Sequence, residues 1–321
     1  MKYRINKNET KVVDGHTLYR IIYTGSDFIT FSGCKVKAGD KGGWLEREEN
    51  LSQNGTCWIA DEACVYDNAK VKADALVGGN ARVYGDAKVT LDAFVHGNAQ
   101  IYGNAQIHGN ARICDYVQVY DFAHIYGDAC VSGEAQIYGS ARISDHADVR
   151  KNTRVCGEAQ VYGNAQVYDK ARIYGEAQVY GEAQVFGNAN IYGEAHVCGK
   201  AYAYCDAHIY GESQVCGKAH VCGNAQIYGK ARIYGYAQVY DFARVYDYAR
   251  VCDEAQIYGD ACVCDGAHIY GRTEVYKRAR VDCQATLFGD VQANGEKQLI
   301  DMAHSFDEMI LAMAVPVRKI N

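Results

Sequence analysis

The chain has almost no proline, no long apolar run and no leader-like start. Proline occurs once among 321 residues, whereas glycine occurs 33 times. Because the glycines recur at a fixed phase, they indicate a repeated turn rather than a flexible linker. No run of about 18 apolar residues is present, so no membrane-spanning helix is expected. Residues 1–4 lack the apolar segment of a signal peptide, which leads us to expect a cytoplasmic protein without a membrane partner.

An excess of basic residues and the common site motifs are also missing. The net charge is −6, with both signs interspersed, so the chain shows no electrostatic footprint for nucleic acid. None of its 14 cysteines forms a CxxC pair, and a structural zinc site is therefore not expected. No nucleophile elbow, P-loop or dinucleotide fingerprint occurs. The sequence predicts no metal site and indicates no cofactor.

The cysteines do not follow the pattern of a disulfide scaffold, which is typical of short secreted chains. Many of them stand where tyrosine stands in neighbouring parts of the sequence, as at Cys114, Cys156, Cys198 and Cys216. We interpret them as small outward residues that replace tyrosine in a reducing compartment.

A six-residue unit fills most of the chain without insertion or deletion. Every sixth residue from Ile59 to Leu287 is Val, Ile or Leu, except Ala203, which makes 39 units. The next positions are often Tyr, then Gly or Asp, then a polar residue. The fifth position is alanine in all but five units, and a long polar residue completes the unit. The five exceptions at the fifth position are Val117, Thr153, Ser213, Thr273 and Val291.

The period of six favours short strands joined by corners. A helix would need a period of 3.6 residues, which six does not match. The polar–aliphatic–tyrosine segment alternates outward, inward and outward as a strand does, and Gly or Asp then turns the chain. Alanine fits a crowded inside corner. Three units close a triangle of 18 residues, so the sequence predicts an all-β, parallel triangular solenoid of about 13 coils.

Two segments without the repeat flank the coils, and we expect them to cap the open ends. Residues 1–58 contain strand-forming stretches at 17–23 and 28–31, and turns are expected at 39–40 and 42–43. This part is predicted as a β-rich N-terminal cap, with residues 59–292 as the repeat domain. From 293 to 321, apolar residues from Leu299 to Met313 recur at helical spacing, which predicts an amphipathic capping helix followed by a tail.

The unit resembles the hexapeptide repeat of left-handed parallel β-helix proteins, a family that includes acyltransferases using acyl-CoA. The left-handed coil is implied by this resemblance. Residues 36–39, 42–44, 51–53, 57–59 and 61–62 also resemble one bacterial subgroup, the YdcK-like proteins of enteric bacteria. That subgroup is named as acetyltransferases on the strength of the repeat. The resemblance therefore implies an acetyltransferase with acetyl-CoA as substrate.

One outward column of the solenoid is almost entirely tyrosine. Its rings are expected one strand spacing apart, as a continuous ladder that stabilises the sheet. The alternative is that the ladder is an interface for a protein partner, a second subunit or a sugar polymer. The candidate interface residues are Tyr66, Tyr84, Tyr102, Tyr120, Tyr138, Tyr174, Tyr192, Tyr210, Tyr228 and Tyr246, with breaks at Cys156 and Cys264.

Catalytic residues are not identified by the sequence. The acyltransferases of this family use a histidine base, and His96, His108, His124 and His146 lie within four coils, all at outward or corner positions. These enzymes also carry a loop that interrupts the coil and helps to build a site between subunits, and this chain has no interruption. We therefore favour a rigid scaffold or a binding and self-assembly module. An acyl-CoA-dependent acetyltransferase with a site between subunits is the alternative.

Overall fold

The structure is a computed structural model of the chain. It describes residues 1–30, 33, 35–295 and 298–300. The chain divides into two compact units, Met1–Gly199 and Lys200–Asn321, and each is considered by itself. Outside the N-terminal cap, both consist of short parallel strands, one for every six residues, and this confirms the expected all-β solenoid. The three faces of the coil are named here by their phase in the repeat.

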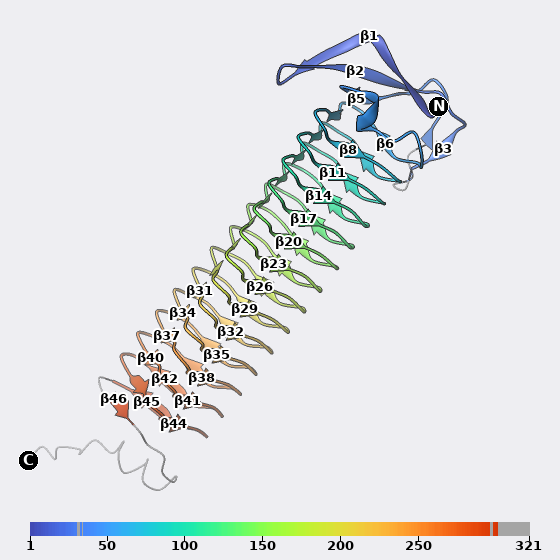
Figure 1. The fold of residues 1–321 in the computed structure, drawn as a ribbon. Coiled ribbons are helices and arrows are strands. Elements are labelled where there is room, and N and C mark those ends of the chain that lie inside the picture. The colour runs from blue at the N-terminus through green and yellow to red at the C-terminus, as the bar shows by residue number, and fades with distance from the viewer. Residues whose placement is uncertain (31–32, 34, 296–297, 301–321) are drawn as a thin grey trace, which may run out of the picture. The chain divides into compact units, whose positions relative to one another are not determined.

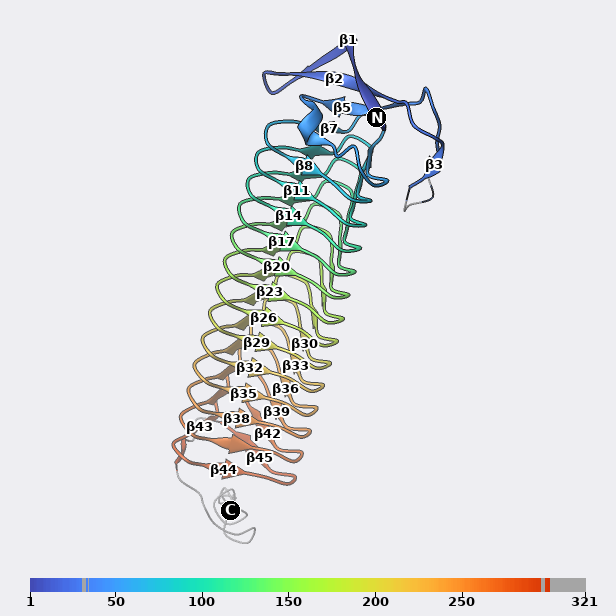
Figure 2. The ribbon, with the colours of Figure 1, turned by 45° about the vertical axis from the view of Figure 1, so that its right-hand side comes forward.

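In the first unit the strands of each face follow one another eighteen residues apart, as the stacked coils of Figure 2 show. The ladder face consists of β7 (Cys64–Val65), β10 (Arg82–Val83), β13 (Gln100–Ile101), β16 (Gln118–Val119), β19 (Gln136–Ile137), β22 (Arg154–Val155), β25 (Arg172–Ile173) and β28 (Asn190–Ile191). The second face consists of β8 (Lys70–Val71), β11 (Lys88–Val89), β14 (Gln106–Ile107), β17 (His124–Ile125), β20 (Arg142–Ile143), β23 (Gln160–Val161), β26 (Gln178–Val179) and β29 (His196–Val197). The third face consists of β6 (Trp58–Ile59), β9 (Leu76–Val77), β12 (Phe94–Val95), β15 (Arg112–Ile113), β18 (Cys130–Val131), β21 (Asp148–Val149), β24 (Gln166–Val167) and β27 (Gln184–Val185).

The second unit repeats the same arrangement. Its ladder face consists of β31 (His208–Ile209), β34 (Gln226–Ile227), β37 (Arg244–Val245), β40 (Cys262–Val263), β43 (Arg280–Asp282) and β46 (Gln298–Ile300). The second face consists of β32 (Gln214–Val215), β35 (Arg232–Ile233), β38 (Arg250–Val251), β41 (His268–Ile269) and β44 (Thr286–Leu287). The third face consists of β30 (Tyr202–Ala203), β33 (His220–Val221), β36 (Gln238–Val239), β39 (Gln256–Ile257), β42 (Glu274–Tyr276) and β45 (Gln292–Asn294).

The core is built from the two apolar positions of the unit. In each pairing the aliphatic residue meets its equivalent one coil on, as Ile101 meets Val119 in a parallel pair. Both side chains are fully buried, as is Ala105 at the fifth position of its unit. Thr153 replaces alanine at such a corner, and its hydroxyl donates to the carbonyl of Arg150 at 2.6 Å. The fifth position therefore accepts a hydroxyl only where a backbone oxygen satisfies it.

The third position of each unit turns the chain in the left-handed region. Gly103 has φ of 65°, and Asp121 holds the equivalent place one coil on with φ of 56°. Glycine adopts this conformation without a Cβ penalty, whereas aspartate requires compensation. The carboxylate of Asp121 provides it by accepting the backbone N–H of Gly139, in the next coil, at 3.1 Å.

The N-terminal cap begins with an antiparallel hairpin of β1 (Tyr3–Val13) and β2 (His16–Tyr23), joined by a turn at Asp14 and Gly15. A second small pair, β3 (Phe28–Ile29) and β4 (Lys35–Val36), follows. Figure 1 shows β1 and β2 beside β5 (Lys41–Leu45), with which β2 pairs antiparallel. Trp44 and Trp58 are both buried where this cap meets the first coils.

An irregular coil connects the cap to the repeat. β5 also pairs in parallel with β7, matching Leu45 to Val65, and Leu51 forms a parallel bridge with Val71. These partners are twenty residues apart instead of eighteen, so two extra residues precede Trp58. The 3-10 helix η1 (Glu48–Asn50) lies in this segment.

The turn expected at residues 42–43 is wrong, because Gly42 and Gly43 lie inside β5. A Cβ on Gly43 would meet Ile59 Cγ2 at 2.4 Å and the Ala63 carbonyl oxygen at 2.5 Å. Glycine is therefore required here for the close approach of β5 to the first regular coil, not for a turn.

The expected C-terminal helix does not include Leu299. Residues Gln298–Ile300 form β46, which pairs in parallel with β43 and matches Leu299 to Val281. The remainder of the expected helix, residues 301–321, lies outside the described residues. Among the residues that the structure does describe, no helix has the length and apolar character needed to cross a lipid bilayer.

Candidate functional site

The tyrosine column of the ladder face forms a stack of parallel rings in the first unit. The ring centroids of Tyr66 and Tyr84 are 5.0 Å apart, and each of the next three pairs, as far as Tyr138, is 4.9 Å apart. The planes of neighbouring rings differ by 1–5°. This geometry follows from strand pairing in register, which places equivalent side chains about 4.8 Å apart. The five rings form a continuous ladder.

The ladder continues in shorter stacks beyond Cys156. Tyr174 and Tyr192 stack at 4.8 Å in the first unit. In the second unit Tyr228 stacks on Tyr210 at 5.0 Å and on Tyr246 at 4.7 Å. Cys264 ends this second stack, and beside it the thiol of Cys262, in β40, donates to the hydroxyl oxygen of Tyr246 at 3.4 Å.

The ladder presents ring edges and hydroxyl groups rather than ring faces. Parallel rings at this spacing cover one another's faces, and Tyr84, Tyr102 and Tyr120 are accordingly half-buried. Among the described residues, no hydrogen-bond partner is found for the hydroxyl groups of these three. Burial, with smaller contributions from Tyr84, Tyr120 and Asp121, raises the pKa of Tyr102 to about 12. The middle of the ladder is thus a row of neutral hydroxyl groups.

The strand residues beside Tyr102, Tyr120 and Tyr138 are also uncharged. The strand residues that precede the core position on this face are Gln100, Gln118 and Gln136, all half-buried. The equivalent residues on the third face, over the corresponding coils, include Arg112 and Asp148. A neutral patch of alternating glutamine and tyrosine therefore covers three consecutive coils of the ladder face.

Further aromatic stacks lie on the other faces and were not among the candidate interface residues. Tyr162 stacks on Tyr180 on the second face, and Tyr240, Tyr258 and Tyr276 stack on the third. The same eighteen-residue spacing identifies them in the sequence. They are shorter than the five-ring stack.

The first ring of the ladder is covered by the cap. Tyr66 is only 1% exposed and packs with Val13, Leu18 and Trp44. Its hydroxyl donates to Asp14 Oδ2 at 2.8 Å. Burial and this hydrogen bond both raise the pKa of Tyr66. The turn of the β1–β2 hairpin therefore closes the N-terminal end of the ladder.

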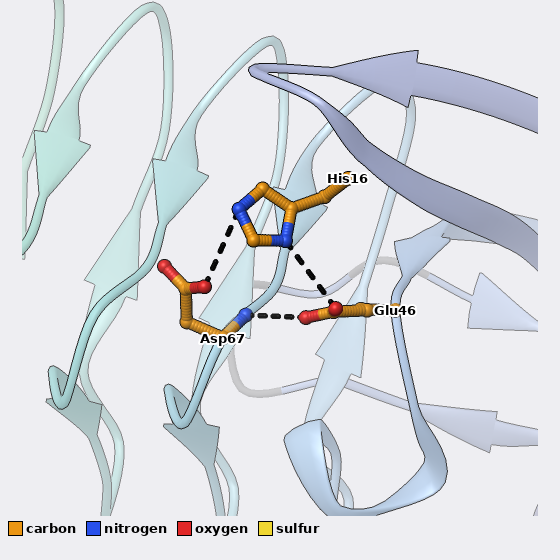
Figure 3. Close-up of side chains that lie close together, drawn as sticks. All are labelled: His16, Glu46 and Asp67. Carbon is orange, nitrogen blue, oxygen red and sulfur yellow. Dashed lines mark hydrogen bonds and ion pairs between the residues drawn. The ribbon is translucent and has the colours of Figure 1, made fainter.

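His16, next to that turn, lies between two carboxylates from different elements (Figure 3). Its Nδ1 is 3.3 Å from Oε1 of Glu46, just after β5, and its Nε2 is 3.4 Å from Oδ1 of Asp67, at the first corner after β7. The backbone N–H of Asp67 donates to Glu46 Oε2 at 2.7 Å. The imidazole also packs against Tyr66, with ring centroids 5.1 Å apart.

The sequence did not indicate this cluster. His16 stands in the cap, where no repeat gives its position, and Glu46 is thirty residues away in the chain. The three side chains could offer ligands to a metal ion, since one atom of each lies within 4.8 Å of the others. In the structure each carboxylate faces a different nitrogen of the ring, Glu46 at Nδ1 and Asp67 at Nε2.

The four histidines considered as catalytic bases do not form one site. His96 lies on the third face, with Nε2 3.9 Å from Asp61 Oδ2. His108 and His124 lie on the second face, and burial lowers the pKa of both. His146 is at a corner, with Nδ1 3.6 Å from Asp128 Oδ2. His96 and His146 thus each have a carboxylate neighbour, and the four histidines lie on two faces and a corner rather than together.

Comparison with known proteins supports the repeat. The model of the YdcK beta solenoid repeat matches residues 159–175 and 225–241, as the resemblance led us to expect. A comparison with curated proteins finds no match.

Among solved structures, the chain is similar in part to UDP-N-acetylglucosamine acyltransferases. The Francisella novicida enzyme is 14% identical, with 60% of this chain and 68% of that chain covered and a TM-score of 0.36. The Arabidopsis enzyme is 10% identical, with coverages of 61% and 67% and a TM-score of 0.28. The O-acyltransferase of Moraxella catarrhalis is 15% identical, with coverages of 66% and 68% and a TM-score of 0.19.

Proposed function

Because the chain carries the YdcK beta solenoid repeat, we propose that it is a non-catalytic scaffold that associates with a second copy of itself through the ladder face. The observation that carries this proposal is the stack from Tyr66 to Tyr138, whose rings repeat every 4.9–5.0 Å with their edges outward. The contact centres on the neutral patch of Gln100, Tyr102, Gln118, Tyr120, Gln136 and Tyr138.

The spacing of the rungs favours another β-solenoid as the partner. A partner that contacts several rungs at once must present its own groups every 4.8 Å or so, which is the distance between neighbouring strands. A second copy of this chain meets that condition without further assumption. A two-fold contact of this kind joins the same surface on both subunits, as most homodimers do.

The chemistry of the patch also suits contact with itself. A charged patch would face like charges across a two-fold axis, whereas the glutamine and tyrosine side chains here are neutral. Tyrosine is enriched at protein interfaces because it offers a large apolar body with one polar atom. A sugar polymer is less well matched, because aromatic platforms for sugars use exposed ring faces, and here the rings cover each other.

The test is the solution mass of the intact chain by analytical ultracentrifugation. We expect a concentration-dependent dimer for the natural protein and a monomer for the double variant Tyr102→Lys, Tyr120→Lys. A matched control changes His108→Lys and Tyr126→Lys, which stack at 5.2 Å in corresponding units of the second face. This control should associate like the natural protein. The variant Tyr102→Phe, Tyr120→Phe keeps the stack but loses two hydroxyl groups, and it should associate more weakly.

Two results would overturn the proposal. One is a natural protein that stays monomeric at every concentration tested. The other is equal loss of association in the ladder-face and second-face variants. The acetyltransferase alternative is checked in parallel: acetyl-CoA should leave the melting temperature unchanged, whereas a bound substrate would raise it.

A further inference from the structure

We propose that the second face of the second unit binds a small phosphate ester, whose phosphate group is held by Arg232 and Arg250 and whose organic part packs against Tyr234. These three residues border a surface pocket of about 280 Å³. Small-molecule sites in proteins measure roughly 300–1,000 Å³, so this pocket suits a small ligand. The site is separate from the ladder face and does not depend on self-association.

The two arginines are neighbours in register on adjacent strands. Arg232 of β35 pairs with Arg250 of β38 (Figure 2), and neighbouring strands lie about 4.8 Å apart. Both side chains are exposed. Like charges directly opposite each other destabilise a sheet, and the guanidinium group of arginine is always charged. An anion bound between the two side chains would remove this repulsion.

Among the residues that the structure describes, neither arginine of this pair forms an ion pair with a carboxylate. Asp247 and Asp265 border a separate pocket, which Arg250 also lines. In the third-face pocket of the same unit, by contrast, Arg272 pairs with Asp290 at 2.7 Å. The positive charge of the second-face pair is therefore available to a ligand from solution.

Tyr234 offers the pocket an uncovered ring face. Its equivalents one coil away on either side are Cys216 and Cys252, whereas Tyr102 of the ladder lies between two other rings. Tyr234 is accordingly 42% exposed. Cys216 borders the pocket and Cys252 does not, so the ring face directed towards Cys216 is the one open to a ligand. A hydrogen bond with Cys252, followed by burial, raises the pKa of Tyr234, and its hydroxyl therefore stays neutral beside an anion.

The charge of the arginine pair favours a phosphate ester over a carboxylate. A phosphate monoester carries a charge of about −1.5 to −2 near pH 7, which matches two guanidinium groups, whereas a carboxylate carries a single charge. The phosphate oxygens can accept paired hydrogen bonds from both side chains. Gln214, one coil before Arg232, also borders the pocket, and its amide can donate to the same group. The ring of Tyr234 favours an ester that has a flat ring of its own.

The experiment is a titration of the full chain with phenyl phosphate or inorganic phosphate, followed by phosphorus NMR. Phenyl phosphate should bind about three- to tenfold more tightly than inorganic phosphate, because only the ester contacts Tyr234. In Arg232→Gln or Arg250→Gln, the affinity for both probes should fall about tenfold or more. In Tyr234→Ala, the advantage of phenyl phosphate should disappear while inorganic phosphate still binds. Benzoate, which has the ring but a single charge, should displace phenyl phosphate only weakly.

The matched control is Arg112→Gln, which removes the same charge from an equivalent strand position of the first unit. Arg112 is exposed, and its neighbours in register are the uncharged Phe94 and Cys130. This variant should bind both probes like the natural protein. All the substituted side chains lie on the surface, so circular dichroism should show every variant folded.

Three results would overturn the proposal. The first is the absence of saturable binding of either probe to the natural protein. The second is an equal loss of affinity in Arg112→Gln, because binding would then depend on the general surface charge. The third is equal affinity for the two probes, which would make the ligand free phosphate instead of an ester. None of these results depends on whether the ladder face associates with a second copy.

Discussion

The N-terminal cap and the coils after it are both built from paired β-strands, but different side-chain contacts stabilise the two regions. In the coils, each aliphatic side chain meets an equivalent one in the next coil, and neighbouring coils repeat the same contacts. In the cap, closure depends on contacts that occur once. Arg20 lies 4.1 Å over the Trp44 ring and pairs with Glu62 at 2.7 Å, and the Trp44 indole N–H donates to Glu62 at 2.9 Å.

This difference indicates where single substitutions should have the most local effect on stability. The stability of a repeat array is approximately the sum of the contributions of its repeats and of the contacts between neighbouring repeats. Equivalent substitutions in different coils should therefore cost similar amounts of free energy. The cap has no equivalent copy of Trp44, Arg20 or Glu62. We therefore expect the cap to respond to single substitutions differently from the coils.

The largest expected effect is that of Trp44→Ala. It removes a buried indole that is 6% exposed, together with its hydrogen bond to Glu62 and its contact with Arg20. The cost should be about 3–5 kcal/mol. Hydrogen exchange should place this loss in residues 1–60, with coils beyond residue 100 still protected. Trp44→Phe serves as the control and should recover most of the packing; uniform loss of protection along the chain would contradict the comparison.

In the coils, Ile125→Ala should cost about 2–5 kcal/mol, because its fully buried side chain fills the solenoid interior. The informative result is equivalence. Ile107→Ala and Ile143→Ala, one coil away on either side of the same face, should give the same unfolding free energy within about 0.5 kcal/mol. Urea denaturation followed by circular dichroism measures this. A spread as large as that among cap variants would remove the distinction between the two regions.

A smaller effect is expected for Gly103→Ala at a corner. Its φ is 65°, and a Cβ would lie 2.9 Å from the backbone nitrogen of Asp121. The left-handed conformation should cost an alanine about 1–2 kcal/mol. Asp121→Gly is the matched change in the other direction and should be nearly neutral. Thermal unfolding of the two variants compares them, and a stabilised Gly103→Ala would show that the corner is not strained.

Acid should loosen the cap before the coils, with the smallest effect of the four. Burial works against ionisation of Glu62, yet hydrogen bonds from Arg20, Trp44 and Lys11 lower its pKa to about 2. Because the folded value lies below the ordinary one of 4.5, the stabilisation is present above about pH 4.5 and is lost as the pH falls towards 2. Tryptophan fluorescence should change in that window while far-ultraviolet circular dichroism holds. Glu62→Gln should abolish the early change in fluorescence.

The sequence predicts the coils well because one local rule is repeated. Burial of Val or Ile at the first position and alanine at the fifth fixes strand, corner and register together, and the structure agrees from Ile59 to Leu287. It predicts the cap poorly, since contacts there join residues far apart without any period. Gly42 and Gly43 suggest a turn, and only the proximity of Ile59 and Ala63 shows why they belong to a strand.

The candidate site divides in the same way. The column from Tyr66 to Tyr138 follows from the eighteen-residue spacing, including the distance between rings. That the rings cover each other's faces depends on side-chain rotation, which spacing does not determine. The cluster of His16, Glu46 and Asp67 needs the fold of the hairpin over the first coil, and no local pattern of residues 14–16 specifies Glu46 and Asp67 as neighbours of His16.

The two extra residues before Trp58 mark the point from which the regular eighteen-residue spacing of the coils begins. Beyond that point, any excision or duplication of eighteen residues restores the phase, so residues 105–122 could be removed to give a shorter protein with both ends intact. Removing six residues would instead rotate everything downstream by one face and split the tyrosine column between two sides. The length of this protein can therefore change in steps of one eighteen-residue coil, counted from the irregular coil before Trp58.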